Sequence, residues 1–193
     1  MTLLHKAIVA VVVASSSIVV AVSPSKSTVA PTDPLQVFGQ RMAAYSELHR
    51  RAAASVSPLR PTADVNEILQ RQADLWGAIV MSRSKARQGE IFDPAVAAAF
   101  RGLIAKALAG IDSAAMLRDL FEDSEELAGY RPHVNAGYPE GATHEMPSVL
   151  LAALPALPEG IVYRLVDVNL VLWDMDADLI VDVLPDALPS EGS

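Results

Sequence analysis

The chain has 193 residues, no cysteine and a formal net charge of −8 at pH 7. The lack of cysteine excludes disulfides and a lipoprotein anchor, and the negative charge argues against binding to nucleic acid. About half of the residues are apolar (51%) but only 5% are aromatic, so we expect one core built mainly from aliphatic side chains.

The first 22 residues have the layout of a secretory signal peptide. Lys6 precedes an uncharged, largely apolar run from Ala7 to Val22. This run contains serines and is shorter than the roughly 18 apolar residues of a membrane span. We therefore favour a cleaved signal peptide, with suitable sites near Ala14 to Ser16 or after Ala21, over a retained anchor. The prediction is an exported protein, periplasmic or secreted.

Residues 23–34 are rich in Ser, Pro, Thr and Lys, a composition that predicts a flexible linker. A helical segment, residues 35–128, is expected next. Its first helix begins at Thr32 or Asp33 and runs to about Ser55. We predict that this helix buries one stripe, formed by Leu35, Phe38, Met42, Tyr45, Ala52 and, in the same stripe, His49. A histidine there is expected to be a boundary residue with a satisfied nitrogen.

The second predicted helix begins with a capping box at Asp64 and Glu67 and continues to about Ala86. Gly89 is the expected C-terminal cap. Cationic side chains close its last turns, namely Arg83, Lys85 and Arg87. Its predicted buried face consists of Val65, Ile68, Leu69, Trp76, Ile79 and Val80.

A third helix is predicted from Asp93 and Pro94 to just before Gly110. Its inward side chains are Val96, Phe100, Leu103, Ile104 and Ala107. A fourth helix, capped by Asp112 or Ser113, ends in the acidic run from Glu122 to Glu126. Acidic residues are unfavourable at a helix C-terminus, so this run is expected to be a solvated end.

Residues 129–147 are predicted to form a loop rich in proline and glycine, which aromatic and apolar side chains such as Tyr130 and Tyr138 hold against the helices. His133, His144 and Glu145 are weak candidates for metal ligands, since imidazole and carboxylate groups bind zinc. Their spacing matches no standard ligand pattern, so we expect no metal site and no cofactor.

Residues 148–189 are predicted to form a short helix, Ser148 to Leu154, followed by three strands at Ile161–Val166, Leu170–Trp173 and Leu179–Leu184. The gaps between the strands are short enough for hairpins, which predicts an antiparallel β-meander. Such a small sheet needs a cover on one face, and the preceding helices can provide it. The expected fold class is α+β: a helical layer of about four helices with the meander packed on it.

Asp174, Asp176 and Asp178 form a DxDxD pattern that resembles the start of a calcium loop. A calcium loop requires glycine at its sixth position and glutamate at its twelfth, where this chain has Leu179 and Pro185. The aspartates are explained without an ion as turn residues between two strands, so they remain weak candidates for a metal site.

Three blocks, Arg87–Ile104, Val134–Asp174 and Leu179–Pro189, resemble those of an uncharacterised family of exported bacterial proteins. Members have a signal peptide, a helical segment and a C-terminal YRxV...LxLxD...LIVDxL module. The resemblance covers roughly half of the chain. It implies a bacterial envelope or secreted setting and assigns neither an activity nor site residues.

The charges are unevenly distributed. The segment from Leu35 to Gly110 contains ten Lys or Arg and six Asp or Glu. The segment from Ile111 onward contains three Lys or Arg and sixteen Asp or Glu. Opposite charges of this kind can attract the two segments to each other or join two molecules head to tail. The alternative is that both segments are simply solvated. The chain contains no GxSxG, HExxH or P-loop motif.

These observations favour a noncatalytic exported protein that binds a partner or supports an assembly. The partner is another envelope protein or a second copy of this chain, and contact with the membrane is expected only through an uncleaved N-terminal segment. Two alternatives stay open: a metal-assisted or other hydrolase that uses the loop histidines, and a membrane-tethered accessory protein.

Overall fold

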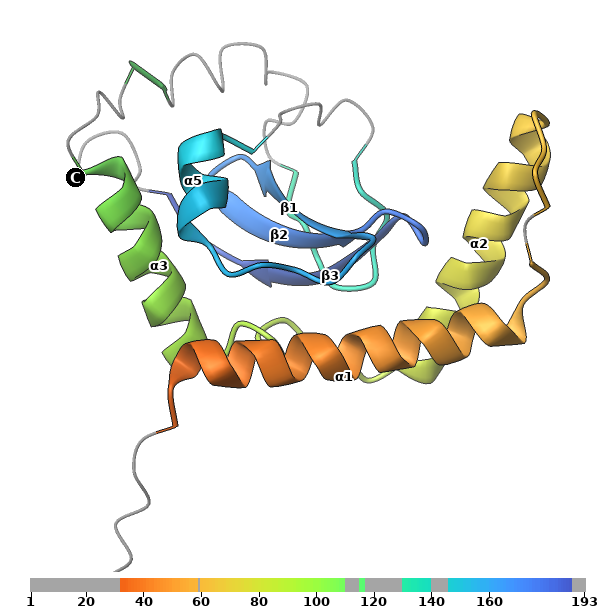
Figure 1. Cartoon of the computed structure of the whole chain (residues 1–193), viewed down its shortest axis with the longest axis horizontal. Helices are drawn as coiled ribbons and strands as arrows, with labels where there is room; N and C mark the ends of the chain where they lie inside the picture. Colours follow the sequence, from red (N-terminus) through yellow and green to blue (C-terminus); the bar gives the residue numbers. More distant parts are fainter. Residues whose placement is uncertain (1–31, 59, 110–114, 117–129, 140–145, 189–193) are drawn as a thin grey trace, which may run out of the picture. The chain divides into compact units, whose positions relative to one another are not determined.

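The structure is a computed structural model that describes residues 32–58, 60–109, 115–116, 130–139 and 146–188. The described helices and the C-terminal three-stranded antiparallel sheet confirm the predicted α+β class (Figure 1). In chain order the elements are α1 (Pro34–Ser55), α2 (Val65–Ser82), α3 (Pro94–Leu108), α5 (Ser148–Ala153), β1 (Ile161–Val166), β2 (Asn169–Asp174) and β3 (Leu179–Leu184).

Some predictions fall outside the described residues. They are the signal peptide, most of the linker, the acidic run after the third helix, and the site candidates His144 and Glu145. Of the predicted fourth helix, only Ala115 and Met116 are described, and both are helical. No helix in the described part of the chain has both the length and the apolar character needed to cross a membrane.

Aspartate side chains begin the three long helices, as the sequence predicts. Asp33 accepts a hydrogen bond from the backbone N–H of Leu35, and Asp93 accepts from Ala95 and Val96. At Asp64 the acceptor oxygen bonds the N–H of Asn66, one residue earlier than the capping box predicts. These bonds satisfy N–H groups that the first helical turn leaves without a partner.

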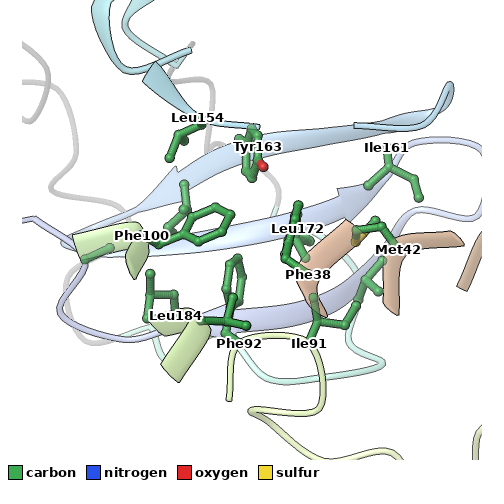
Figure 2. Packing of buried hydrophobic residues seen from close by; sticks show 14 of the residues in the cluster. Phe38, Met42, Ile91, Phe92, Phe100, Leu154, Ile161, Tyr163, Leu172 and Leu184 are labelled. Carbon is green, nitrogen blue, oxygen red and sulfur yellow. The ribbon is translucent and has the colours of Figure 1, made fainter. Parts of the chain in front are cut away.

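The predicted stripe of α1 is confirmed, because Phe38, Met42, Tyr45 and Ala52 are all buried. Phe38 forms one side of an aromatic cluster that joins α1 and α3 to the sheet (Figure 2). In this cluster the ring centroid of Phe100 lies 4.7 Å from that of Phe38, 5.1 Å from that of Phe92 and 6.1 Å from that of Tyr163. Such pairs add about 0.5–1.5 kcal/mol each to the free energy gained by burial alone.

The sheet has the order β1-β2-β3, and both connections are hairpins. Asp167 and Asp178 in these turns have positive φ angles, 53° and 46°, which aspartate tolerates better than most residues. One face of the sheet packs on the helices. The other buries a small cluster of Val166, Val171, Ile180 and Val183.

This second cluster is covered by the loop that contains Tyr130 and Tyr138. The loop is also bound to β3 through two backbone hydrogen bonds: Ile180 donates to Ala136, and Asn135 donates to Ile180. The prediction that the loop packs on the helices is therefore wrong. A sheet with apolar side chains on both faces needs two covers, and the loop supplies the second.

Helix α2 differs most from its prediction. It ends at Ser82, and Gly89 is not its cap but lies in the following loop with a φ of +88°. Only Leu75 and Ile79 are buried on this helix. Four side chains predicted to be buried are exposed instead: Val65 (63%), Ile68 (41%), Leu69 (55%) and Trp76 (40%).

The loop between α2 and α3 is held by a buried carboxylate of β3. Asp182, which is fully buried, accepts hydrogen bonds from the backbone N–H groups of Gly89, Ile91 and Phe92 over 2.7–2.9 Å. The N–H of Val183 also donates to this carboxylate, so four backbone donors satisfy its charge. The bonds position Phe92 in the aromatic cluster.

Candidate functional site

A pocket of about 360 Å³ lies where α1 and α2 meet the turn between β2 and β3. All three elements contribute side chains to it, so the pocket depends on the folded arrangement of segments far apart in the sequence. Its lining consists of His49, Ala53, Ile68, Arg71, Gln72, Leu75, Met175 and Asp176. This combination of apolar walls and a few charged groups is typical of ligand and partner sites.

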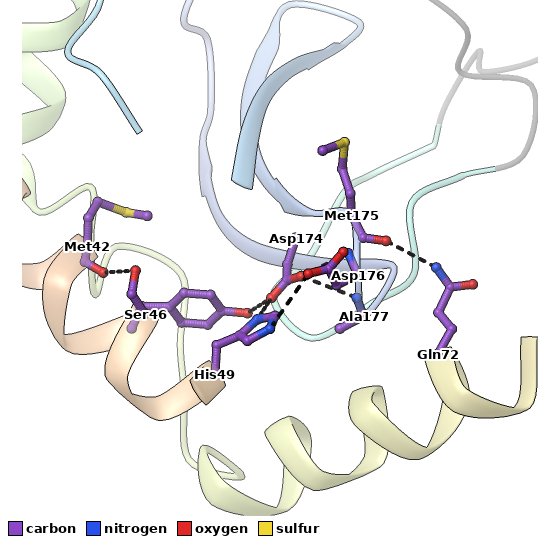
Figure 3. A network of polar contacts seen from close by, with 9 residues as sticks. Met42, Ser46, His49, Gln72, Asp174, Met175, Asp176 and Ala177 are labelled. Atoms are coloured by element: carbon purple, nitrogen blue, oxygen red, sulfur yellow. Dashed lines mark hydrogen bonds and ion pairs between the residues drawn. The ribbon is translucent and has the colours of Figure 1, made fainter. Parts of the chain in front are cut away.

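His49 stands on α1 one helical turn after Tyr45 and reaches the end of β2 (Figure 3). Its Nδ1 lies 2.6 Å from Oδ2 of Asp174. The His49 side chain is 20% exposed and that of Asp174 is fully buried. The contact therefore joins the first helix to the last hairpin beside the pocket.

Asp174 is surrounded by hydrogen-bond donors. Oδ2 accepts from the hydroxyl of Tyr45 at 2.7 Å as well as facing His49. Oδ1 accepts from the backbone N–H groups of Asp176 and Ala177. The carboxylate thus uses all of its acceptor positions within the protein, and the last two bonds close the turn between the strands.

The second nitrogen of His49, Nε2, lies 3.9 Å from Oδ2 of Asp176. The hydrogen bond to Asp174, together with the negative charges of Asp174 and Asp176, raises the pKa of His49 above its ordinary value, although burial and Arg71 act in the opposite direction. Two carboxylates flanking one imidazole favour its protonated form. His49 is therefore suited to donate hydrogen bonds and to carry positive charge, more than to accept a proton.

Tyr45 connects this network to Arg83. Burial raises the pKa of the Tyr45 phenol, and the Asp174 carboxylate raises it further, so the hydroxyl stays protonated and donates. The guanidinium of Arg83 lies over the Tyr45 ring at 5.3 Å and donates to the carbonyl of Val181 at 2.8 Å. Contacts from α1, the C-terminus of α2 and β3 thus meet around Tyr45, which shares the Asp174 carboxylate with His49.

Arg71 is the second cationic side chain that lines the pocket. Its Nε and Nη1 are both buried, and neither has a hydrogen-bond partner in the part of the chain that the structure describes. Gln72, next to it, is engaged: its Nε2 donates to the carbonyl of Met175 at 3.1 Å. Arg71, which lines the pocket, therefore has covered cationic donors that the described protein groups leave unused.

The rim of the pocket is apolar on the side of α2. Ile68 and Met175 line the pocket and are also exposed to solvent, 41% and 39% respectively. Further exposed apolar side chains continue along α2 to Trp76, whose Nε1 donates to the carbonyl of Asn135. We call the group Val65, Ile68, Leu69 and Trp76 the apolar side of α2.

Two of the candidates singled out in the sequence, Asp174 and Asp176, do lie at this site. Asp178 belongs to another cluster, since its Oδ1 accepts from Nε1 of Trp173 and from the N–H of Tyr138. His133 is exposed in the loop. Among the described residues, no group of three or more His, Asp or Glu side chains is arranged to hold a metal ion.

His49 and Arg71 could not be identified as site residues from the sequence. The sequence predicts that His49 lies in a buried stripe but does not predict its partner. No pattern distinguishes Arg71 from the other polar residues of its helix. The pattern that could have pointed to the site is a histidine on a core-facing stripe combined with a DxD turn.

The chain matches no protein-family model, no curated protein and no solved structure.

Proposed function

We propose that this protein is a noncatalytic, exported binding module of the bacterial envelope, which docks a partner protein on the apolar side of α2. The observation that carries the proposal is the exposure of large apolar side chains at the edge of a pocket with charged groups. Export is inferred from the N-terminal sequence, Lys6 followed by the apolar run from Ala7 to Val22.

The apolar side of α2 has the composition of an interface. Val65, Leu69 and Trp76 recur at spacings of four and seven residues and therefore lie on the same side of the helix. Tryptophan is enriched among the residues that contribute most to protein–protein affinity. Leaving this stripe in water is unfavourable by about 25 cal/mol for each Å² of apolar surface, and a partner that covers it recovers that free energy.

The partner best suited to this surface is a protein segment with an apolar face of its own. An amphipathic helix meets the requirement, because it places apolar side chains at intervals of three and four residues along a groove or helix face. Arg60 and Arg71 lie near the first half of α2 together with Glu67 and Asp74, so a partner with charged residues of both signs beside its apolar face fits this surface.

Binding is better supported than hydrolysis at this pocket. The eight lining side chains include no hydroxyl or thiol that could act as a nucleophile. The hydrogen bond to Asp174 raises the pKa of His49, so this imidazole favours holding a proton over removing one from water.

Site-specific photo-crosslinking in the native envelope tests the proposal. A photoreactive residue is placed at Ala73, an exposed position between Leu69 and Trp76, and the crosslinked products are identified. We expect one recurrent partner, whose crosslink is lost when Leu69→Glu is introduced. The matched control is Met81→Glu on the same helix, since Met81 is 82% exposed and lies about 140° around the helix from Trp76.

Three results would contradict the proposal. Recovery of the chain only as an uncrosslinked monomer would exclude a stable partner. Equal loss of the crosslink in Leu69→Glu and Met81→Glu would place the contact elsewhere. Binding to protein-free lipid vesicles that depends on Leu69 would assign the surface to a membrane. Mass spectrometry of the exported chain separately tests cleavage of the signal peptide, because an intact N-terminus would exclude cleavage.

A further inference from the structure

We propose that the pocket between His49 and Arg71 binds a carboxylate carried beside an apolar side chain. The inference rests on the proposed function, because this carboxylate would belong to the partner segment that docks on α2. It adds a specific ligand chemistry to what is otherwise an apolar contact.

The first argument comes from the donors of Arg71. A buried N–H group without an acceptor is unfavourable, and more so when the donor is charged. Nε and Nη1 of Arg71 are in this situation, and no described carboxylate forms an ion pair with this guanidinium. Arginine binds best to a planar group with two acceptor oxygens, which can form a bidentate contact. A carboxylate has this geometry.

Two acidic side chains that line a pocket together with Arg71 have contacts of their own. Asp176 lies beside His49, and Asp74 accepts a hydrogen bond from Gln70 at 2.8 Å. Because Nε and Nη1 are covered, a carboxylate in the pocket reaches them only after the Arg71 side chain rotates. That rotation exchanges two donors without partners for two charge-assisted hydrogen bonds, so the carboxylate favours it.

The second argument comes from the walls. Four apolar side chains line the pocket beside Arg71, namely Ala53, Ile68, Leu75 and Met175. A volume of about 360 Å³ accommodates a carboxylate together with a branched aliphatic side chain. A bare inorganic anion would satisfy Arg71 but would leave these walls in water, so the pocket is better matched to an amphiphilic carboxylate.

The third argument concerns His49. The groups that face its ring are Asp174 at the end of β2, Asp176 in the turn and Arg71 on α2, while Tyr45 shares the carboxylate of Asp174. The positive charge of Arg71 lowers the pKa of His49, and a carboxylate bound at Arg71 would offset that charge. Binding should therefore raise the pKa of His49 and be tighter at lower pH.

The test is an NMR titration of the full chain with N-acetyl-leucine, which carries a free carboxylate and a branched apolar side chain. A parallel titration uses N-acetyl-leucinamide, which has the same shape without the charge. We expect the carboxylate to shift the His49 ring signals and to raise the pKa of His49, and the amide to bind at least about tenfold more weakly. Acetyl-leucyl-glutamate amide then distinguishes a side-chain carboxylate from a chain terminus.

Arg71→Gln should weaken binding of N-acetyl-leucine by at least about tenfold. Arg60→Gln is the matched control, since Arg60 is an exposed arginine of the neighbouring pocket that does not line this one. If Arg71→Gln does not fold, the binding of acid and amide to the unaltered chain still shows whether the pocket selects a carboxylate.

Three outcomes overturn the inference: equal binding of acid and amide, unchanged affinity in Arg71→Gln, or inorganic phosphate binding as tightly as N-acetyl-leucine. These outcomes are separate from the crosslink at Ala73. If the crosslink forms but N-acetyl-leucine does not bind, the proposed docking surface is supported and the carboxylate site is contradicted. If N-acetyl-leucine binds but no crosslink forms, the carboxylate site is supported and the proposed partner on α2 is contradicted.

Discussion

Nδ1 of His49 lies 2.6 Å from Oδ2 of Asp174, although 125 residues separate the two in the sequence. This contact joins α1 to the turn between β2 and β3. The hydroxyl of Tyr45 donates to the same oxygen, so two side chains one helical turn apart hold one buried carboxylate. A buried carboxylate is costly unless it is paired, and these two donors make its position on β2 favourable.

The His49–Asp174 contact predicts a pH-dependent stability. The pKa of His49 is raised in the folded protein by its hydrogen bond to Asp174, so the protonated ring stabilises the fold. This stabilisation is complete below the pKa of the unfolded chain, about 6.5, and is lost as the pH rises through the raised pKa. His49→Gln should therefore lower the free energy of unfolding by about 2 kcal/mol at pH 6 and by less at pH 9.

Urea denaturation of both proteins at several pH values between 6 and 9 measures this difference. His133→Gln is the control, because His133 is an exposed histidine of the loop and lies outside the His49–Asp174 contact. A difference between the unaltered chain and His49→Gln that stays constant with pH would show that the stabilisation does not come from the charged ring.

Asp182→Asn should destabilise the fold by about 3 kcal/mol or more. The carboxylate accepts from four backbone N–H groups, whereas an amide has one oxygen and an NH₂ group that would face donors. Asp167→Asn serves as the control, since Asp167 is exposed in a turn with positive φ that asparagine also tolerates. Chemical denaturation compares the two variants, and equal stabilities would contradict the assigned importance of Asp182.

The strands could be predicted from the sequence because their signals are local. Dense runs of strand-forming residues separated by short turns indicate where β1 and β3 begin and end, and both predictions match the structure. The exposed face of α2 could not be predicted, since an apolar stripe does not show which part of it a neighbour covers. On α2 the core covers Leu75 and Ile79 but leaves Leu69 in solvent.

Only part of the site could be predicted from the sequence. The spacing of Asp174 and Asp176 marks them as candidates, and their place between two strands indicates turn residues. Their contact with His49 is a tertiary one, and a single sequence contains no information that pairs residues 125 positions apart. Asp182 gave a local signal, a charged residue within an apolar strand, but its backbone partners lie in a distant loop.

Gly160→Ala is expected to destabilise the fold, and Gly102→Ala to stabilise it. Gly160 has a φ of +81°, and a Cβ there would lie 3.2 Å from Oδ2 of Asp176, so alanine is both strained and crowded. The expected loss is about 1–2 kcal/mol. Gly102 lies within α3 with no atom within 4 Å of an added Cβ, and alanine should add about 0.5–1 kcal/mol there. Thermal unfolding measures both, and a loss at Gly102 would contradict its open surroundings.

Two leucines of α2 test which side of this helix faces the core. Leu75 is 2% exposed and Leu69, which the sequence predicts to be buried, is 55% exposed. Leu75→Ala should lower the free energy of unfolding by about 2–5 kcal/mol, because it removes buried methyl groups and leaves a cavity. Leu69→Ala should change it by no more than about 0.5 kcal/mol, as for other exposed positions. Because both changes remove the same atoms from the same helix, their difference in urea denaturation reports burial alone. Equal losses would mean that the apolar side of α2 is packed inside the protein, and this surface would then be closed to a partner.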